Sequence, residues 1–476
     1  MVDPITGEVV PNRKKGEKKV YFFCKTQNCS VKGVGVSFLL DHVADETGLV
    51  KIMKSVFPDD WQAIMSCAYF LISEGTALSR VERWSSANVV PYKGTLTSQR
   101  VSELLVRIPR ERQHMFFSKW VDQNRTDEYY ALDITSVSSY SEIIDFVRRG
   151  YNRDKEKLPQ VNMLLVNGET SHMPLYFQVL PGSIKDVSTL CETLSTLDLI
   201  DARIIHMVMD KGFYSEANID AMYGKHIKFI IGVPFTVGYA NEMVNKARVE
   251  GIRSHMNYRR IFDDEIYVKS TISKWKGHRC YIHVYYDSLK AELENRKFDR
   301  LLYDCFLELE CGTTVDAHKL HYKKFFHVRE TPKRGRKVEY NQEAIDGYRE
   351  NTTGWFVMIT NDIKDPVKAL EIYRQKDTVE KAFDDLKNDL DGKRLRIHSE
   401  QAMEGRLFIQ FVALILSAKI KRVMNKEGWY KNYDMQQVID EMKSMREVKM
   451  EGSWKKIRTT PTALQGKIIK LFGLSA

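Results

Sequence analysis

Long apolar runs are missing from this 476-residue sequence. The longest one covers residues 407–418, which is too short for a membrane helix because such a helix needs about 20 apolar residues. The N-terminus is charged and carries no apolar segment of the kind that directs secretion. We therefore predict a soluble protein of the cytosol that does not use a membrane as a partner.

Cysteines are few and irregularly placed. The seven cysteines form an odd number scattered along the chain, which is not the pattern of a disulfide framework, so we expect reduced thiols. Cys24 and Cys29 have the spacing of half a zinc site, but no second close pair follows them. Repeats and low-complexity segments are also lacking, which excludes a solenoid or a repeat array.

The composition is typical of a globular protein, and positive charges are in excess. Hydrophobic residues make up 43% of the chain and the net charge is +10. The length predicts two or three domains, each with its own core. Basic residues cluster at residues 12–19, at residues 331–337 and after residue 419. Such clusters attract polyanions by counterion release, although each one alone is typical of a solvated surface.

The first quarter of the chain has a helical pattern. Residues 1–35 are polar and basic and are predicted to be an irregular arm. Apolar spacing over residues 36–125 predicts short helices that end at Gly48, Pro58 and Gly75. We interpret this region as a helical DNA-binding domain with Arg100 facing outward, although a plain helical bundle fits the pattern equally well.

After residue 125 the period changes to that of strands. Short β-rich runs at residues 128–138, 161–166, 173–180, 203–210 and 228–234 predict a mixed sheet with helices on its faces. Residues 126–234 would be the first part of this core and residues 367–425 its second part. Residues 235–366 are too long for a simple connection and are predicted to be a β-rich insertion domain. Residues 426–476 form a basic C-terminal region.

Three acidic residues occupy unusual positions. Asp133 lies inside an apolar strand, Asp210 directly follows an apolar run, and Glu380 lies on a helix after the predicted sheet. A buried carboxylate is costly unless it is paired or bound to a cation. An Asp at a strand end is also typical of a turn or a helix cap, so Asp210 alone decides nothing.

The helix around Glu380, "YRQKDTVEKAFDDLK", carries polar residues on one stripe. At 100° per residue, Tyr373, Lys376 and Lys387 lie within about 40° of Glu380, while an apolar flank faces the sheet. A solvent-exposed face with ion pairs from Lys376 and Lys387 to Glu380 would produce the same stripe. The helix therefore indicates a functional site only when it is considered together with Asp133 and Asp210.

The spacing of this stripe resembles a known signature. Tyr373, Lys376, Glu380 and Lys387 match the YREK pattern of the DDE transposases of bacterial insertion sequences, with Lys376 in place of Arg. Lysine keeps the charge of that position but loses the fork that grips phosphate bidentately. The segments "VMDKGFYSE", "PGSIKD" and "HSEQAMEGRLFIQFVAL" are also similar to that family, and the resemblance covers about residues 36–425.

The resemblance implies a ribonuclease H-like core in which Asp133, Asp210 and Glu380 converge and bind two Mg²⁺ (or Mn²⁺) ions for phosphoryl transfer. It implies cleavage of double-stranded DNA at terminal inverted repeats and joining to target DNA by a homodimer or synaptic complex in the bacterial cytosol or nucleoid. It implies no small-molecule substrate. The candidate DNA contacts are Tyr373, Lys376, Lys387, Trp355, Arg100, Lys333, Arg334 and Arg336.

Trp355 and Trp275 are candidates to stack a flipped base if cleavage passes through a hairpin, although a tryptophan in a strand is more often core. Two other functions stay open at this point. One is a catalytically inactive, transposase-derived DNA-binding protein, and the other is a ribonuclease H-fold nuclease of recombination. Metal-dependent nicking separates a transposase from the first, and strand transfer separates it from the second.

Overall fold

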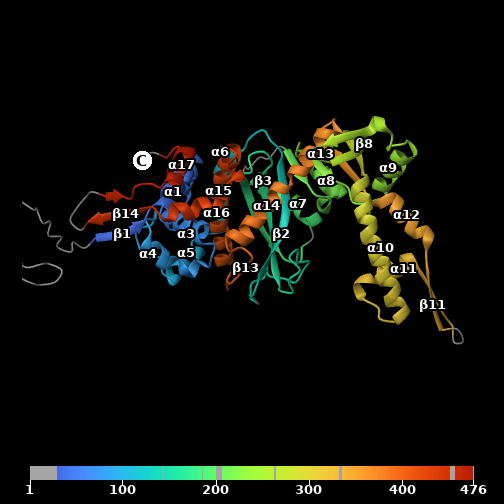
Figure 1. Cartoon of the computed structure of the whole chain (residues 1–476), viewed down its shortest axis with the longest axis horizontal. Coiled ribbons are helices and arrows are strands. Elements are labelled where there is room, and N and C mark those ends of the chain that lie inside the picture. The colour runs from blue at the N-terminus through green and yellow to red at the C-terminus, as the bar shows by residue number, and fades with distance from the viewer. Residues whose placement is uncertain are drawn as a thin grey trace, which may run out of the picture.

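The computed structural model describes residues 29–474 except 142, 185, 200–205, 262–263, 332–334 and 451–455. The molecule is elongated: helices from both ends of the chain gather at one end, a sheet lies in the middle, and a helical arm with a β-hairpin projects at the other end (Figure 1). Of the predicted basic arm, residues 1–28 lie outside the described part of the chain.

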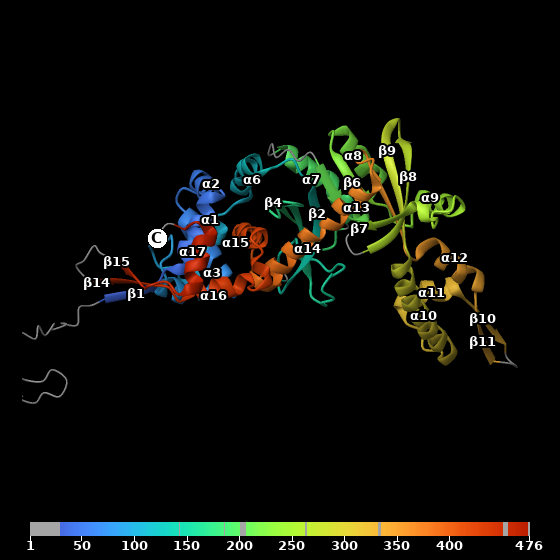
Figure 2. The same cartoon turned by 45° about the horizontal axis from the view of Figure 1, so that its top comes forward.

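Helices from the N-terminal quarter and the C-terminus pack into one domain (Figure 2). Its elements are α1 (Gly35–Glu46), α2 (Leu49–Val56), α3 (Trp61–Glu74), α4 (Val81–Ala87), α5 (Ser98–Val106), α6 (Arg110–Asn124), α15 (Glu400–Lys426), α16 (Met435–Lys443) and α17 (Ala463–Phe472). Gly48 and Gly75 have positive φ angles of 71° and 57° at helix boundaries, where glycine avoids the strain of a Cβ. The predicted helix ends are thus confirmed at these two glycines.

The centre of this domain is α15, whose apolar run is buried against α1, α3 and α5. The C-terminal region belongs to the same domain, because α16 packs on α1 and α3. The small sheet there consists of β1 (Cys29–Gly33), β14 (Arg446–Met450) and β15 (Lys456–Arg458). Since β1 pairs with β14, the described beginning of the chain lies beside its last quarter.

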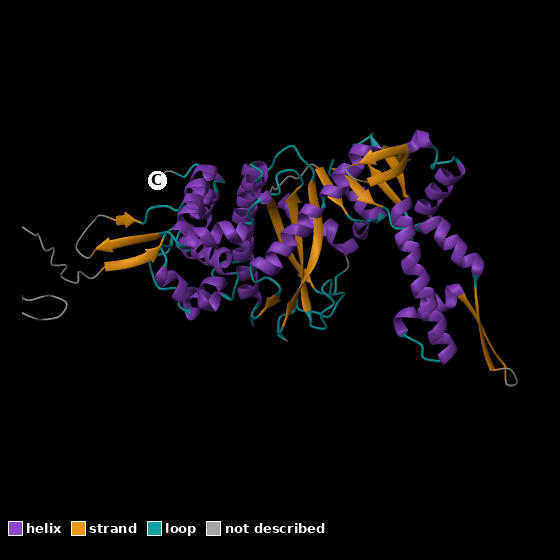
Figure 3. Ribbon diagram, viewed as in Figure 1, coloured by secondary structure: helices purple, strands orange, loops and turns teal. Residues whose placement is uncertain are grey.

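The middle of the molecule is a mixed sheet with helices (Figure 3). Its first five strands are β2 (Tyr130–Ser139), β3 (Gln160–Gly168), β4 (Pro174–Pro181), β5 (His206–Met209) and β6 (Lys228–Gly232), in the spatial order β4-β3-β2-β5-β6. Strands β2, β3 and β4 pair antiparallel, whereas β2, β5 and β6 pair parallel. The helices α7 (Asp186–Leu199) and α8 (Glu216–Gly224) flank β5 in the chain. The predicted mixed sheet with helices is confirmed.

Residues 235–366 contribute further strands to this same sheet. They are β7 (Tyr258–Ile261), β8 (Asp264–Trp275), β9 (His278–Asp287) and β12 (Trp355–Thr360), and β12 joins β9 to β6. The helix α9 (Gly238–Val249) packs on β9 and β12. The rest of the segment is the arm, made of α10 (Ser288–Cys311), α11 (Lys319–Phe325), β10 (Phe326–Thr331), β11 (Gly335–Tyr340) and α12 (Gln342–Thr352).

The predicted helix over residues 373–387 is not straight, which corrects the sequence analysis. It consists of α13 (Pro366–Gln375), α14 (Asp377–Asp384) and a π-helical turn (Asp385–Asp389). At the junction, the Lys376 amide bonds to the Tyr373 carbonyl and the Val379 amide to the Lys376 carbonyl, so the spacing tightens to three residues. The angles calculated for a regular helix hold only within each piece. The short strand β13 (Arg394–Leu395) then pairs with the end of β2.

None of the helices in the described part of the chain has both the length and the apolar character of a membrane span.

One contact in the helical domain leads to a prediction. A Cβ added at Gly405 in α15 would lie 2.1 Å from the Leu105 carbonyl oxygen in α5. We expect Gly405→Ala to destabilise the protein by about 1–3 kcal/mol through overpacking, although helix propensity alone would favour Ala. As the matched control, Gly347→Ala in α12 meets no atom within 4 Å and should raise the melting temperature. A raised melting temperature for Gly405→Ala would contradict the close packing of α5 on α15.

Candidate active site

Asp133 in β2 and Asp210, directly after β5, each follow one member of a pair of neighbouring strand residues. The parallel register of β2 and β5 pairs Leu132 with Met209, so the next position on each strand is Asp133 and Asp210. Equivalent positions on paired strands are about 4.8 Å apart. Because β5 ends at Met209, Asp210 is at the carboxyl end of the strand, where open α/β sheets place their ligands.

A hydrogen bond from Tyr373 holds Asp210 in its ionised form. The Tyr373 hydroxyl donates to Asp210 Oδ1 at 2.6 Å. Burial alone would raise the pKa of Asp210, but this bond and the positive charge of Lys376 outweigh burial and lower the pKa. Burial and the charges of Asp210, Asp133 and Asp377 raise the pKa of Tyr373, so its hydroxyl remains a donor.

Arg153 neutralises Asp133. The Arg153 guanidinium lies 3.1 Å and 3.3 Å from the two carboxylate oxygens, and the Ile134 amide donates to Oδ1 at 2.8 Å. Arg153 lies in the connection between β2 and β3, and its backbone amide donates a hydrogen bond to the Ser136 hydroxyl. Sequence reasoning missed Arg153, because no pattern in that connection indicates which strand residue its side chain meets.

Glu380 is positioned by α14, which packs on β2 and β3 through buried Val379 and Phe383. Its side chain is 57% exposed and lies 3.6 Å from the Lys376 ammonium. Within the described residues, Asp133, Asp210 and Glu380 do not gather with all ligand atoms inside 4.8 Å of one another. The structure therefore brings the two aspartates together and leaves Glu380 on the adjacent helix with a solvent-exposed side chain.

The predicted phosphate contacts are engaged within the protein. Lys387 lies 2.7 Å from Asp154, and its side chain is only 9% exposed. The Lys376 ammonium is 5.4 Å from the centre of the Tyr373 ring as well as being close to Glu380. Arg374 is paired with Asp264 at 2.6 Å, so it does not take the place of the missing arginine of the signature.

The carboxylates fit the divalent ions that the sequence predicts. Asp210 is ionised, and Asp133 is compensated by a guanidinium that a metal ion can replace. Oxygen ligands of this type suit Mg²⁺ or Mn²⁺. Asp377, in the first turn of α14, is a further carboxylate near the Tyr373 hydroxyl that the sequence analysis did not select.

Comparison with known families identifies the family to which the chain belongs. The family described as "Transposase DDE domain" matches residues 124–416, which is more than half of the chain. The chain belongs to this transposase DDE family. No curated protein matches its sequence. Among solved structures, it is similar to a piggyBac transposase synaptic complex with hairpin DNA. The identity is 11% and the TM-score 0.39, over 85% of this chain and 70% of that chain, which is too low to support any functional argument.

The other predicted DNA contacts of this DDE transposase lie far from the acids in sequence. Arg100 is exposed, and its guanidinium bonds to the Thr95 carbonyl. Arg336, also exposed, donates to the Leu309 carbonyl near the end of α10. Lys333 and Arg334 lie outside the described residues.

Trp355 has the environment of a core residue, which corrects its prediction as a stacking platform. It is 3% exposed, its indole N–H donates to the Glu350 carbonyl, and its ring lies 4.8 Å from that of Tyr286. Although Trp355 borders a cavity of about 470 Å³, its packing is that of a core side chain. Trp275 is partly exposed and donates to Asp220, which holds it against α8.

The Tyr373–Asp210 bond leads to a pH-dependent prediction. Because the pKa of Asp210 is lowered by folding, its contribution to stability is present above the unfolded pKa and is lost as the pH falls through the folded pKa. Tyr373→Phe removes the donor, so we expect a loss of about 1.5–3 kcal/mol at neutral pH. The difference from wild type should shrink as Asp210 becomes protonated, which urea unfolding over a series of pH values in chelator will measure.

Tyr285→Phe is the matched control, because Tyr285 donates to the Pro366 carbonyl, which does not titrate. Its cost should stay constant over the same pH range. A cost of Tyr373→Phe that is equally independent of pH would show that Asp210 is not the charged partner.

Proposed function

We propose that this protein is a DNA transposase that cleaves at terminal inverted repeats and joins the ends to target DNA. Asp133, Asp210 and Glu380 would hold two Mg²⁺ or Mn²⁺ ions for this reaction. The observation that carries the proposal is the placement of Asp133 beside Asp210 at the carboxyl end of a parallel strand pair. Membership of the DDE family supports the same reaction class.

Bound ions would supply activation of the attacking water or 3′-hydroxyl and stabilisation of the leaving oxygen. The protein's own residues prepare the site for this chemistry. Tyr373 holds Asp210 ionised and oriented. Arg153 compensates the charge of Asp133, and a bound cation would compete with the guanidinium for the same oxygens. Glu380, exposed on α14, would complete the set of ligands.

The first test is cleavage of DNA that carries the flanks of the coding gene, in the presence of Mn²⁺. We expect Asp133→Asn, Asp210→Asn and Glu380→Gln each to abolish cleavage while DNA binding stays within about twofold of wild type, because removal of a ligand spares the binding surface. Asp384→Asn is the matched control on the same helix, since Asp384 is an exposed carboxylate one turn from Glu380. It should keep cleavage, and because Asp384 also lines the cleft described below, its DNA affinity should be equal to or higher than that of wild type.

Asp377→Asn tests the identity of the third acid. The variant should cleave normally if Glu380 is that acid. Loss of cleavage in Asp377→Asn with retention in Glu380→Gln would transfer the role to Asp377. Joined products distinguish a transposase from a nuclease, and binding without nicking in the wild type would identify an inactive DNA-binding protein.

A basic cleft beside α14 is the place where we propose that the DNA backbone passes. The cleft has a volume of about 480 Å³ and is lined by Lys381 of α14 and Arg422 of α15, both exposed. Burial and these two positive charges lower the pKa of His172, which also lines the cleft. The lining also contains Lys421, Asp384 and Asp385, and Lys421 is paired with Asp385, so Lys381 and Arg422 are the exposed cations of the cleft.

Lys381→Gln and Arg422→Gln should each weaken DNA binding and reduce the slope of log affinity against log salt by about 1, because each removes one phosphate contact. The loss should be equal for transposon-end DNA and unrelated DNA, since phosphate contacts carry no sequence information. An unchanged slope in both variants would exclude this cleft as the path of the backbone. Fluorescence anisotropy at several salt concentrations measures both quantities.

A further inference from the structure

The arm has a small hydrophobic cluster of its own, separate from the main core. Its nine buried members are Phe298, Leu302, Cys305, Leu309, Tyr322, Phe325, Phe326, Val338 and Ile345. A core of this size stabilises a structural unit weakly, and small units commonly depend on a disulfide or a metal ion as well. A cross-link between its helices would therefore contribute more in the arm than in the main core.

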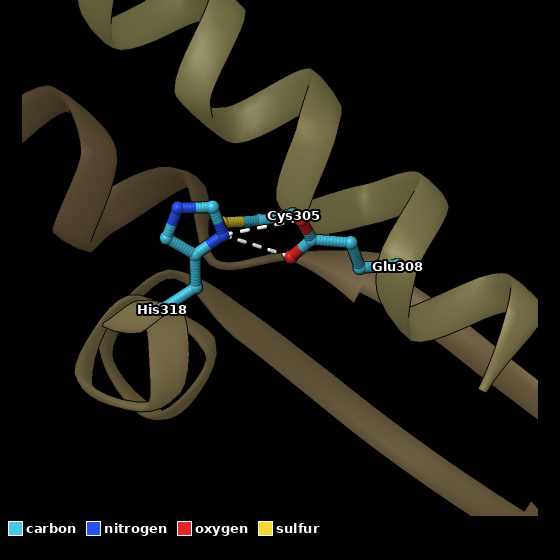
Figure 4. Close-up of side chains that lie close together, drawn as sticks. All are labelled: Cys305, Glu308 and His318. Carbon is cyan, nitrogen blue, oxygen red and sulfur yellow. Dashed lines mark hydrogen bonds and ion pairs between the residues drawn. The ribbon is translucent and has the colours of Figure 1, made fainter. Parts of the chain in front are cut away.

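Three side chains that can ligate metals meet at the edge of this cluster (Figure 4). Cys305 and Glu308 lie one turn apart on α10, and His318 ends the 3₁₀ turn (Asp316–His318) that leads into α11. One sulfur, one carboxylate oxygen and one ring nitrogen lie within 4.8 Å of one another. Across the described residues, this is the one group of three or more His, Cys, Asp or Glu side chains that meets this distance.

Hydrogen bonds orient the three ligands. His318 Nδ1 lies 2.9 Å and 3.2 Å from the two oxygens of Glu308, and the Tyr322 hydroxyl donates to the same carboxylate. The Tyr322 oxygen in turn accepts from the Val315 amide at 3.0 Å. These hydrogen bonds join Glu308, His318 and Tyr322 without involving Cys305. The Cys305 thiol beside them is therefore an additional, soft metal ligand.

The cluster is closed on one side and open on the other. Cys305 is 0% exposed, whereas the side chains of Glu308 and His318 are 20% and 26% exposed. An ion can therefore enter from the solvent side and be held against the core. The centre of the His321 ring is 6.2 Å from that of the His318 ring.

We propose that Cys305, Glu308 and His318 bind a divalent transition-metal ion of the zinc class, which joins α10 to α11. A set of one sulfur, one nitrogen and one oxygen suits zinc, while Mg²⁺ and Ca²⁺ prefer oxygen alone. Water or His321 supplies the fourth ligand. The ion stiffens the arm and is separate from the ions at Asp133 and Asp210.

Binding is coupled to proton release. A cysteine ligates a metal ion as its thiolate, so binding releases the thiol proton to solvent, and a histidine ligates through a ring nitrogen that carries no proton. The affinity therefore rises with pH.

Cobalt is the probe that tests this site in the full-length protein. After treatment with chelator, Co²⁺ should produce a thiolate-to-cobalt charge-transfer band that saturates at one ion per chain. The oxygen ligands at Asp133 and Asp210 cannot produce this band. Cys305→Ala should abolish it, and Zn²⁺ should displace it. Tyr322→Phe should keep the band with about tenfold weaker affinity, because Tyr322 only orients the ligand Glu308.

Two exposed cysteines provide matched controls: Cys311, on the same helix as Cys305, and Cys29 in β1. Cys311→Ser and Cys29→Ser should retain the full band. The proposal is overturned if folded wild-type protein gives no band, if Cys305→Ala keeps it, or if Cys311→Ser removes it. The wild-type titration alone is decisive if Cys305→Ala does not fold.

Discussion

The hydrogen bond between Tyr373 and Asp210 joins two parts of the chain that are 163 residues apart. It is formed only because β12 returns the chain beside β6 and so places α13 over β5 and β6. Gly232 at the end of β6 allows this approach, since a Cβ there would lie 3.0 Å from the Tyr373 hydroxyl oxygen. The orientation of Asp210, the break of the helix after Tyr373 and the position of α14 on the sheet all depend on this closure.

Charge compensation is the second constraint on the site. Two charges near the site have counterparts inside the protein: Arg153 pairs with Asp133, and Asp154 pairs with Lys387. Glu156 holds Arg394 of β13 from the same connection between β2 and β3. Pairing avoids the cost of isolated charges in a poorly solvated place. One connection thus supplies partners to β2, to the π-helical turn and to β13.

The arm follows a different principle. The main core is continuous from the helical domain through the sheet, so it stabilises the site without further aids. The arm has only the small cluster around α10 and α11, and directional contacts at Cys305, Glu308 and His318 supplement it. Rigidity of the arm and rigidity of the site therefore have separate origins, and either can be altered without the other.

The sequence by itself determined the local elements and the candidate aspartates. Short β-rich runs located β2 to β6, glycines located helix ends, and the resemblance to DDE transposases implied that Asp133 and Asp210 converge. These signals are local, so they describe what each segment can form. Only the tertiary structure decided that β7, β8, β9 and β12 extend the core sheet, that the helix breaks at Lys376, and that Arg153 and Asp154 meet Asp133 and Lys387. The tertiary structure also decided that the Trp355 side chain is buried, because burial depends on which elements pack against its strand. Contacts between distant segments depend on how the whole chain folds. The spacing of residues within one segment does not determine them.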